Sequence, residues 1–265
     1  MFTSVASFSQ VKIPTSNLAS FFYDANEGSS FIDRSLHVQN GIITNSGSLA
    51  HYSTLTGSYW NFDGTTVNTN FTMPDYNVQS MKKTFFAVVK EATPANGNAV
   101  NQSFQFLKIP GTGTRGYAAR ASNSNVLPSM PSGFFADLGG SIFGIPSTCG
   151  TCIFESPGEI TLGRPYLGSP PVSFGAGEWT LVVCTHNYPG AQPHSQEYYF
   201  NNALRYSSEN RTGTTGEGGL LTMGSTTGGP WLIGAMGFYN NVALNEEQRT
   251  DLYNYYNDIY PLGSV

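Results

Sequence analysis

The sequence predicts an all-β fold, an antiparallel two-sheet β-sandwich with a short C-terminal helix. From residue 21 to about residue 240, short β-branched and aromatic runs alternate with turns rich in Gly, Asn and Ser. Two of these runs are continuously apolar, which is typical of central strands buried on both faces. A helical period of apolar residues appears only after residue 245. A chain of 265 residues is long enough to build such a core without a disulfide or a metal.

The expected elements follow in chain order. Residues 1–20 show weak periodicity and are expected to form an arm or a first edge strand, and residues 21–265 to form one sandwich. Residues 84–89 (TFFAVV) and 179–184 (WTLVVC) are the two continuously apolar strands. Residues 103–108 (SFQFLK) alternate between apolar and polar, as a half-buried strand does.

Turn residues predict two hairpins. Asn201 and Asn202 stand between two aromatic runs and tolerate the positive φ of a type I′ turn. Residues 111–116 (GTGTRG) match the G-x-G-x-x-G dinucleotide pattern, which requires a helix directly afterwards. Residues 117–122 run instead into a loop, and Pro110 precedes the first Gly. We therefore interpret this segment as the turn of a hairpin and not as a nucleotide site.

The C-terminal helix is predicted at about residues 245–260. Asn245 can cap its first turn, and Gln248 stands at the capping-box position. Pro261 follows where the helix should stop. One apolar face is expected from Leu252, Tyr255, Tyr256 and Ile259.

Charge and hydropathy exclude several partners. The formal net charge is −5, and the 12 Lys and Arg residues are scattered. Nucleic-acid binding needs a basic stripe to neutralise phosphates, so nucleic acid is not an expected partner. No apolar stretch reaches the length of a membrane span, so no membrane insertion is expected. The first residues lack the pattern of a signal peptide, which predicts a cytosolic protein or one exported by another route, such as particle assembly.

The three cysteines leave several interpretations open. Cys149 and Cys152 form a C-x-x-C pair, and Cys184 with His186 is the only nearby second pair of ligand types for zinc. Residues 140–157 are predicted to be a loop and not the strand-to-helix junction of a redox motif. The cysteines are therefore expected to be loop thiols or a local bridge, with metal binding as the alternative.

Three segments together resemble a known family. Residues 21–26 (FFYDAN), 59–65 (YWNFDGT) and 238–247 (FYNNVALNEE) resemble, in this order, signature strands of the concanavalin A-like, laminin-G-like jelly-roll family. The resemblance is to versions found in structural proteins of phages and large viruses. The family's W-x-D-L-S-G motif is reduced to residues 32–35 (IDRS), and Asn202 replaces its hairpin Gly.

The resemblance implies a non-enzymatic virion structural protein on the virion surface: a capsid decoration protein, a minor capsid protein or a fibre component. Its expected partners are other virion or capsid proteins, with host glycans and a homo-oligomer left open. The alternative is a free carbohydrate-binding module or adhesin, secreted or at the cell surface without a recognisable signal peptide. A glycoside hydrolase or polysaccharide lyase on the same fold is a third hypothesis.

A catalytic set is not found in the sequence. The glucanase pattern E-x-D-x-E is absent, and Glu155 and Glu159 are separated by a Ser-Pro-Gly turn. The histidines share no metal-ligand spacing, and no G-x-S-x-G elbow occurs. We therefore expect no enzyme activity and no cofactor, with calcium left open at Asp24, Asp33 and Asp63.

A glycan site would use aromatic rings and hydrogen-bonding side chains on loops and strand ends. For two of the candidates, the tryptophans, a place in the core is the favoured interpretation. The candidates are Trp60, Trp231, His186, Asn187 and Tyr188.

Overall fold

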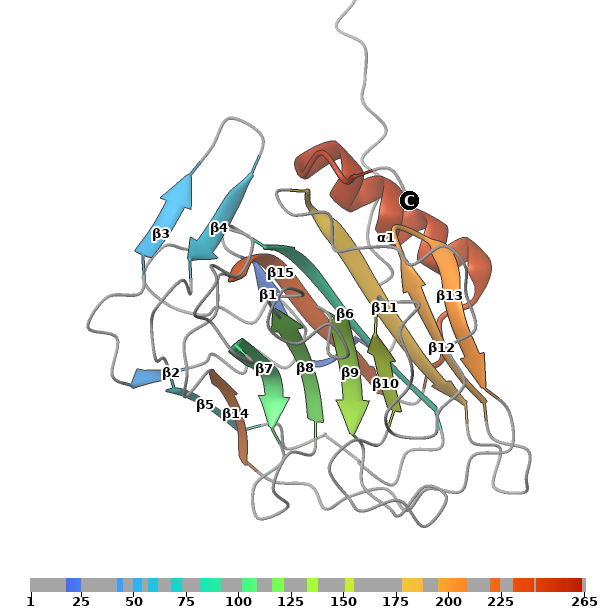
Figure 1. The fold of residues 1–265 in the computed structure, drawn as a ribbon, viewed down its shortest axis with the longest axis horizontal. Helices are drawn as coiled ribbons and strands as arrows, with labels where there is room; N and C mark the ends of the chain where they lie inside the picture. The colour runs from blue at the N-terminus through green and yellow to red at the C-terminus, as the bar shows by residue number, and fades with distance from the viewer. Residues whose placement is uncertain are drawn as a thin grey trace, which may run out of the picture.

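The structure is a computed structural model (Figure 1). It describes residues 18–24, 42–44, 50–53, 57–61, 68–72, 82–91, 102–108, 116–121, 133–137, 151–154, 178–187, 195–208, 220–224, 231–240 and 242–263. Within this part the chain forms two antiparallel sheets and one C-terminal helix, so the predicted fold class is confirmed.

The first sheet has eight strands. Strand β15 lies near its middle and pairs with β6 along one side, while β4 and β1 share the other side. In spatial order the strands are β13 (Ala203–Ser208), β12 (Ser195–Phe200), β11 (Thr180–Asn187), β6 (Lys82–Glu91), β15 (Trp231–Asn240), β4 (Ser58–Asn61) and β3 (Ala50–Ser53), with β1 (Leu18–Asp24) on β15.

The second sheet has seven strands, and each described pairing is antiparallel. In spatial order they are β10 (Thr151–Phe154), β9 (Gly133–Asp137), β8 (Gly116–Ala121), β7 (Gln102–Lys108), β14 (Leu220–Gly224), β5 (Asn68–Thr72) and β2 (Ile42–Thr44). Some strands that are neighbours in this sheet are distant in sequence. Strand β14, for example, comes late in the chain and lies between β5 and β7.

Most of the predicted strands are confirmed. Residues 84–89 of β6 are fully buried, and β6 lies between β11 and β15. Strand β7 covers the alternating segment and pairs with β8, with Lys108 opposite Gly116. The G-x-G-x-x-G segment therefore connects two hairpin strands, and the residues after it form a strand and not a helix.

One prediction was wrong, and one falls largely outside the described residues. Residues 140–157 were predicted to be a loop, yet β10 lies within them and pairs with β9. Its sequence, Thr-Cys-Ile-Phe, is rich in β-forming residues, which prevail over the surrounding Gly and Pro. Strand β1 includes the last three residues of the predicted arm, residues 18–20, and residues 1–17 lie outside the described part.

The predicted helix is confirmed as α1 (Glu246–Ile259). Asn245 Oδ1 accepts a hydrogen bond from the Gln248 amide at 2.9 Å, and Gln248 Oε1 accepts one from the Asn245 amide at 3.0 Å. This reciprocal capping box satisfies amides at the first turn that have no partner within the helix. Leu252 and Tyr256 are buried on the expected apolar face, and the helix ends one residue before Tyr260.

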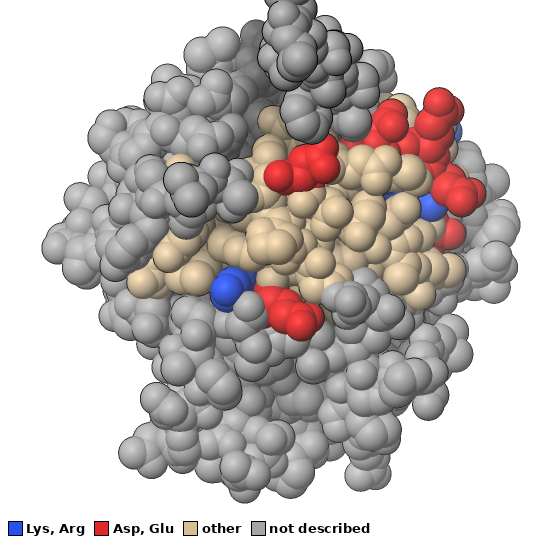
Figure 2. Space-filling view, turned by 90° about the horizontal axis from the view of Figure 1, so that it is seen from above, with Lys and Arg blue, Asp and Glu red and all other residues tan. Residues whose placement is uncertain are grey.

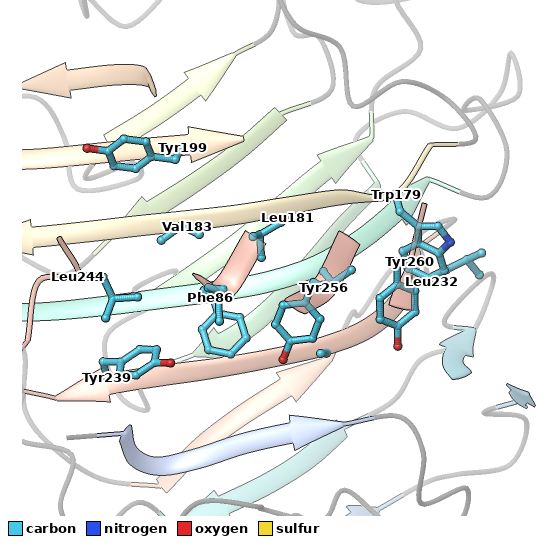
Figure 3. Close-up of a cluster of buried hydrophobic side chains, with 13 residues drawn as sticks. Phe86, Trp179, Leu181, Val183, Tyr199, Leu232, Tyr239, Leu244, Tyr256 and Tyr260 are labelled. Atoms are coloured by element: carbon cyan, nitrogen blue, oxygen red, sulfur yellow. The ribbon is translucent and has the colours of Figure 1, made fainter. Parts of the chain in front are cut away.

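Helix α1 covers the outer face of the eight-stranded sheet. Alternate residues of β6 point to opposite faces, and Phe86 and Val88 join the cluster beneath α1 (Figure 3). A Cβ at Gly237 would overlap the Phe86 ring, so the glycine lets this ring pack directly against the backbone of β15. The buried cluster comprises Phe86, Val88, Trp179, Leu181, Val183, Tyr199, Leu232, Ala235, Tyr239, Leu244, Leu252, Tyr256 and Tyr260.

Buried Thr84 fixes the chain where it passes from β15 to α1. Its Oγ1 donates to the Val242 carbonyl at 3.0 Å and accepts from the Leu244 amide at 3.0 Å. Leu244 belongs to the A-L-N segment of the family resemblance, and Val242 directly precedes that segment. The side chain of Leu244 is buried in the cluster, and Asn245 directly after it caps the helix. This short segment therefore sets both the position and the start of α1.

The chain end is attached to the sheet through Asn201, in an arrangement that we call the C-terminal clasp. Asn201 Oδ1 accepts from the Leu181 amide at 2.7 Å, and its Nδ2 donates to the Gly263 carbonyl at 2.7 Å. The Gly263 amide donates to the Trp179 carbonyl at 2.9 Å. The φ angles of Asn201 and Asn202 are 46° and 66°, as a type I′ turn requires.

We predict that Asn201→Gly destabilises the protein more than Asn202→Gly. Glycine tolerates the positive φ at both positions, so the pair isolates the side-chain hydrogen bonds. Asn201 makes two such bonds to backbone groups, whereas Asn202 makes one, to Thr250 Oγ1 at 3.1 Å. We expect a loss of about 1–3 kcal/mol for Asn201→Gly and about 1 kcal/mol or less for Asn202→Gly. Urea unfolding measures both, and equal losses would contradict the clasp.

Candidate functional site

The two predicted tryptophans lie at one end of the eight-stranded sheet. Trp60 is only 2% exposed, so its prediction as a glycan-binding residue is corrected: it is a core residue. The reason is its place on β4, opposite Ile233 of the buried strand β15. Trp231 begins β15 opposite Glu91, and nothing further about its side chain is described.

His186 and Asn187 lie at the other end of the same sheet. They are the last two residues of β11, and Asn187 is opposite Lys82, the first residue of β6. Trp231 is opposite the last residue of this ten-residue strand, so the two ends are about 30 Å apart at 3.3 Å per residue. Tyr188 lies outside the described residues. The five predicted residues therefore do not form one site.

Around Asn187, hydrogen-bonding residues share one face of the sheet. Thr185 and Asn187 alternate along β11, with Glu197 opposite Thr185 and Lys82 opposite Asn187. Thr84 is also opposite Thr185 and binds the entry of α1, so this is the face on which α1 packs. We call Lys82, Thr185, Asn187 and Glu197 the polar end.

Glu197 is the centre of a hydrogen-bonded group that extends to α1. Its Oε2 accepts from Tyr199 Oη at 2.7 Å and from Thr185 Oγ1 at 3.4 Å. The Arg249 guanidinium lies 3.9 Å from the centre of the Tyr199 ring, and its Nη1 donates to the Leu244 carbonyl at 2.7 Å. Burial raises the pKa of Tyr199, and its bond to Glu197 raises it further. The phenol therefore stays a donor across the physiological pH range.

Two buried polar atoms in this region have no hydrogen-bond partner: Asn187 Oδ1, an acceptor, and Arg249 Nε, a donor. Folded proteins leave few buried polar atoms unpaired, because each one costs about 1–3 kcal/mol. Asn187 itself is half-buried at the end of β11, so its amide oxygen is enclosed while the residue reaches the surface. A buried acceptor without a donor, such as Asn187 Oδ1, occurs in folded proteins where a water, an ion or a functional role accounts for it.

The outer surface over α1 is acidic. Seen from above, Asp and Glu side chains outnumber Lys and Arg on the described surface (Figure 2). Glu246, Glu247 and Asp258 of α1 are exposed. The expectation from composition that nucleic acid is not a partner stays a prediction.

Metal and thiol chemistry have little support among the described residues. No group of three or more His, Cys, Asp or Glu residues occurs there that could hold a metal ion. Cys184 is fully buried, and this burial raises its pKa well above the usual value, which disfavours the thiolate that binds metals. Asp24 ends β1, opposite Ala235. The other residues considered for calcium, bridging or catalysis lie outside the described part: Asp33, Asp63, Cys149, Glu155 and Glu159.

Sequence reasoning found Asn187 but missed its neighbours. Glu197 and Lys82 are 10 and 105 residues away along the chain, and only the pairing of β12, β11 and β6 brings them together. The one local signal was the polar character of these strand ends next to apolar strand centres. That pattern marks the end of a strand but does not show which strand ends are neighbours.

No protein-family model matches the sequence, and no curated protein matches it. Solved structures do match. The receptor-binding domain of the botulinum neurotoxin C/D mosaic serotype gives a TM-score of 0.62 at 9% identity over 91% of this chain and 52% of that chain. The botulinum neurotoxin serotype D binding domain gives 0.58 at 10% identity over 90% and 52%. Trypanosoma rangeli sialidase gives 0.52 at 15% identity over 91% and 33%.

The structure therefore has the concanavalin A-like jelly-roll fold that the family resemblance implied. The chain spans about half the length of the neurotoxin domains and a third of the sialidase. At these identities the likeness defines the fold and leaves the ligand to be argued from the residues. No helix in the described part is long and apolar enough to cross a membrane.

Proposed function

We propose that this protein is a lectin-like binding domain that recognises carbohydrate or a glycan-bearing receptor and has no enzyme activity. The observation that supports this most is the extent of the structural likeness. About nine-tenths of the chain superposes on about half of the receptor-binding domains of botulinum neurotoxins, so the likeness extends over almost all of this sandwich. A binding function also needs hydrogen-bonding side chains at the surface, and at the polar end Lys82 is exposed while Asn187 and Glu197 are half-buried.

A non-catalytic role fits the one acidic group that the structure describes at the polar end. Glu197 uses one carboxylate oxygen to accept bonds from Tyr199 and Thr185. Glycoside hydrolysis needs two carboxyl groups facing each other across the scissile bond. The sequence lacks the glucanase pattern of such a pair. Glu197 is therefore assigned a binding and structural role.

We predict that a glycan array will give selective binding to a subset of glycans. The array is run with calcium and again with EDTA, because calcium is the one cofactor that the sequence leaves open. Loss of binding in EDTA would assign calcium to the protein. Heat-denatured protein is the control for non-specific adsorption. Absence of binding to every glycan under both conditions would contradict the proposed function.

We propose the virion surface as the setting in which this domain acts, with capsid or other virion proteins as assembly partners. The support is a resemblance: residues 243–247 (ALNEE), which form the entry, cap and first turn of α1, resemble the closing signature of jelly-roll domains in structural proteins of phages and large viruses. Mass spectrometry of purified particles from the source, compared with soluble lysate, is expected to recover the protein in stoichiometric amounts. Absence from particles would leave the free carbohydrate-binding module as the function.

A further inference from the structure

We infer that the outer face of the eight-stranded sheet contains a preformed socket for one phenol ring, which Tyr260 fills from the end of α1. Gly57, Ser58, Trp179 and Gly234 form this ring socket. The ring socket is a binding site in its own right, and its ligand class is a para-substituted phenol. Tyr260 is a tethered ligand of this class that holds the C-terminal segment on the sheet. The ring socket is independent of the proposed function.

The first observation is how completely the Tyr260 side chain is enclosed. Tyr260 directly follows α1 with an extended backbone and is only 4% exposed. Its ring lies beside Trp179 with ring centres 4.8 Å apart, within the range of favourable aromatic pairs (Figure 3). Its Oη donates a buried hydrogen bond of 2.6 Å to the Ser58 carbonyl. Both the ring and its hydroxyl therefore have a defined partner on the sheet.

The second observation is that two glycines make room for the ring. Gly234 is the extra residue of a β-bulge in β15, between Ile233 and Ala235, which pair with consecutive residues of β6. A Cβ at Gly234 would lie 2.6 Å from Tyr260 Oη, and a Cβ at Gly57 would lie 3.1 Å from the same ring. Neither glycine has a positive φ that would require one. Their role is therefore to admit the ring close to the backbone.

The walls of the ring socket belong to strands that are paired without Tyr260. Gly57 and Ser58 lie at the start of β4, which pairs with β15, and Trp179 directly precedes β11. Removal of the Tyr260 ring is therefore expected to leave a hollow bounded by the sheet. Enclosed apolar cavities of this kind bind small aromatic molecules. The Ser58 carbonyl adds an acceptor for the hydroxyl, so a phenol substituted opposite its hydroxyl is the matching ligand.

The residues after Tyr260 add to the same attachment. Leu262 forms a parallel bridge with Trp179, and the Gly263 amide donates to the Trp179 carbonyl at 2.9 Å. Asn201 holds the Gly263 carbonyl at 2.7 Å. A tethered group binds its site at a high effective concentration, so the tether and the ring socket reinforce each other. Together they form a latch that fixes the end of α1.

The test is chemical rescue of Tyr260→Ala with p-cresol, which is the tyrosine side chain as a free molecule. The substitution is expected to lower the Tm, and p-cresol to raise it again, because it binds the folded state. At about ten times its Kd, p-cresol is expected to raise the Tm by roughly 3–5 °C. Its isomer o-cresol places the hydroxyl away from the Ser58 carbonyl and is expected to bind about fivefold more weakly.

Tyr255→Ala is the matched control for the loss of a ring from the same helix. Tyr255 is half-buried and packs edge-on to Tyr256, with ring centres 5.0 Å apart. Its removal is also expected to lower the Tm, but it leaves a position that is open to solvent. We expect p-cresol to shift the Tm of this variant no more than that of the wild type, in which Tyr260 fills the ring socket.

A double-mutant cycle tests the space at Gly234 without an empty ring socket. Gly234→Ala is expected to lower the urea midpoint of the wild type, because its Cβ would overlap the Tyr260 ring. Tyr260→Leu retains an apolar side chain but lacks the ring atoms that lie against Gly234. In that background we expect Gly234→Ala to lower the midpoint by less than about half as much.

Each contrary outcome overturns a stated part of the inference. Equal Tm shifts with the two cresols, or equal rescue of Tyr255→Ala, would overturn the ring socket as a phenol site. So would a Tyr260→Ala protein that stays unfolded in saturating p-cresol, because the ring socket would then depend on the tether. An equal loss from Gly234→Ala in both backgrounds would overturn the role of the glycine. Glycan binding is unaffected by any of these results, so the proposed function stands or falls separately.

Discussion

The burial of the outer face of the eight-stranded sheet by α1 is the constraint on which the rest of the structure depends. Strands β6 and β11 are apolar on both faces, so one sheet-to-sheet interface cannot bury them. Uncovered, Phe86, Val88 and Leu181 would form an exposed apolar patch of the kind that causes association. One amphipathic helix, α1, covers this patch, and several hydrogen bonds and ring contacts fix its position.

These contacts lie at both ends of α1. At its start, Thr84 binds the segment before the helix and Asn245 caps it. At its end, Tyr260 packs on Trp179 with ring centres 4.8 Å apart and donates from Oη to the Ser58 carbonyl at 2.6 Å. The C-terminal clasp then attaches the following residues to β11. The polar end lies beside the start of this helix, so the position of Arg249 and Tyr199 there is a consequence of how α1 is held.

Local sequence patterns were sufficient to predict several strands and the helix. The apolar run of β6 and the capping residues of α1 each act within a few positions, so they predict their elements directly. The roles of Asn201 and Glu197 could not be predicted, because each depends on a partner brought close only by the fold. Asn201 binds Gly263, which is 62 residues away. Trp60 and Asn187 both fitted a glycan site by residue type, and only the sheet register separated them.

The fold by itself leaves the ligand open. Neurotoxin binding domains and a sialidase share it with this chain at 9 to 15% identity, which is too low to transfer a site residue by residue. The ligand must therefore be argued from what this chain places at its surface. For Asn187, a candidate suggested by the sequence, the structure adds one observation, an enclosed acceptor without a donor.

Native-state hydrogen exchange tests the central claim most directly. If α1 and the eight-stranded sheet form one cooperative unit, the amides of α1 and those of β6 and β11 will exchange through the same opening, with similar protection. They will also lose protection together as urea is added. Exchange of α1 at least a hundredfold faster than β6, with β6 still protected, would contradict the account, because the sheet would then be stable without its cover.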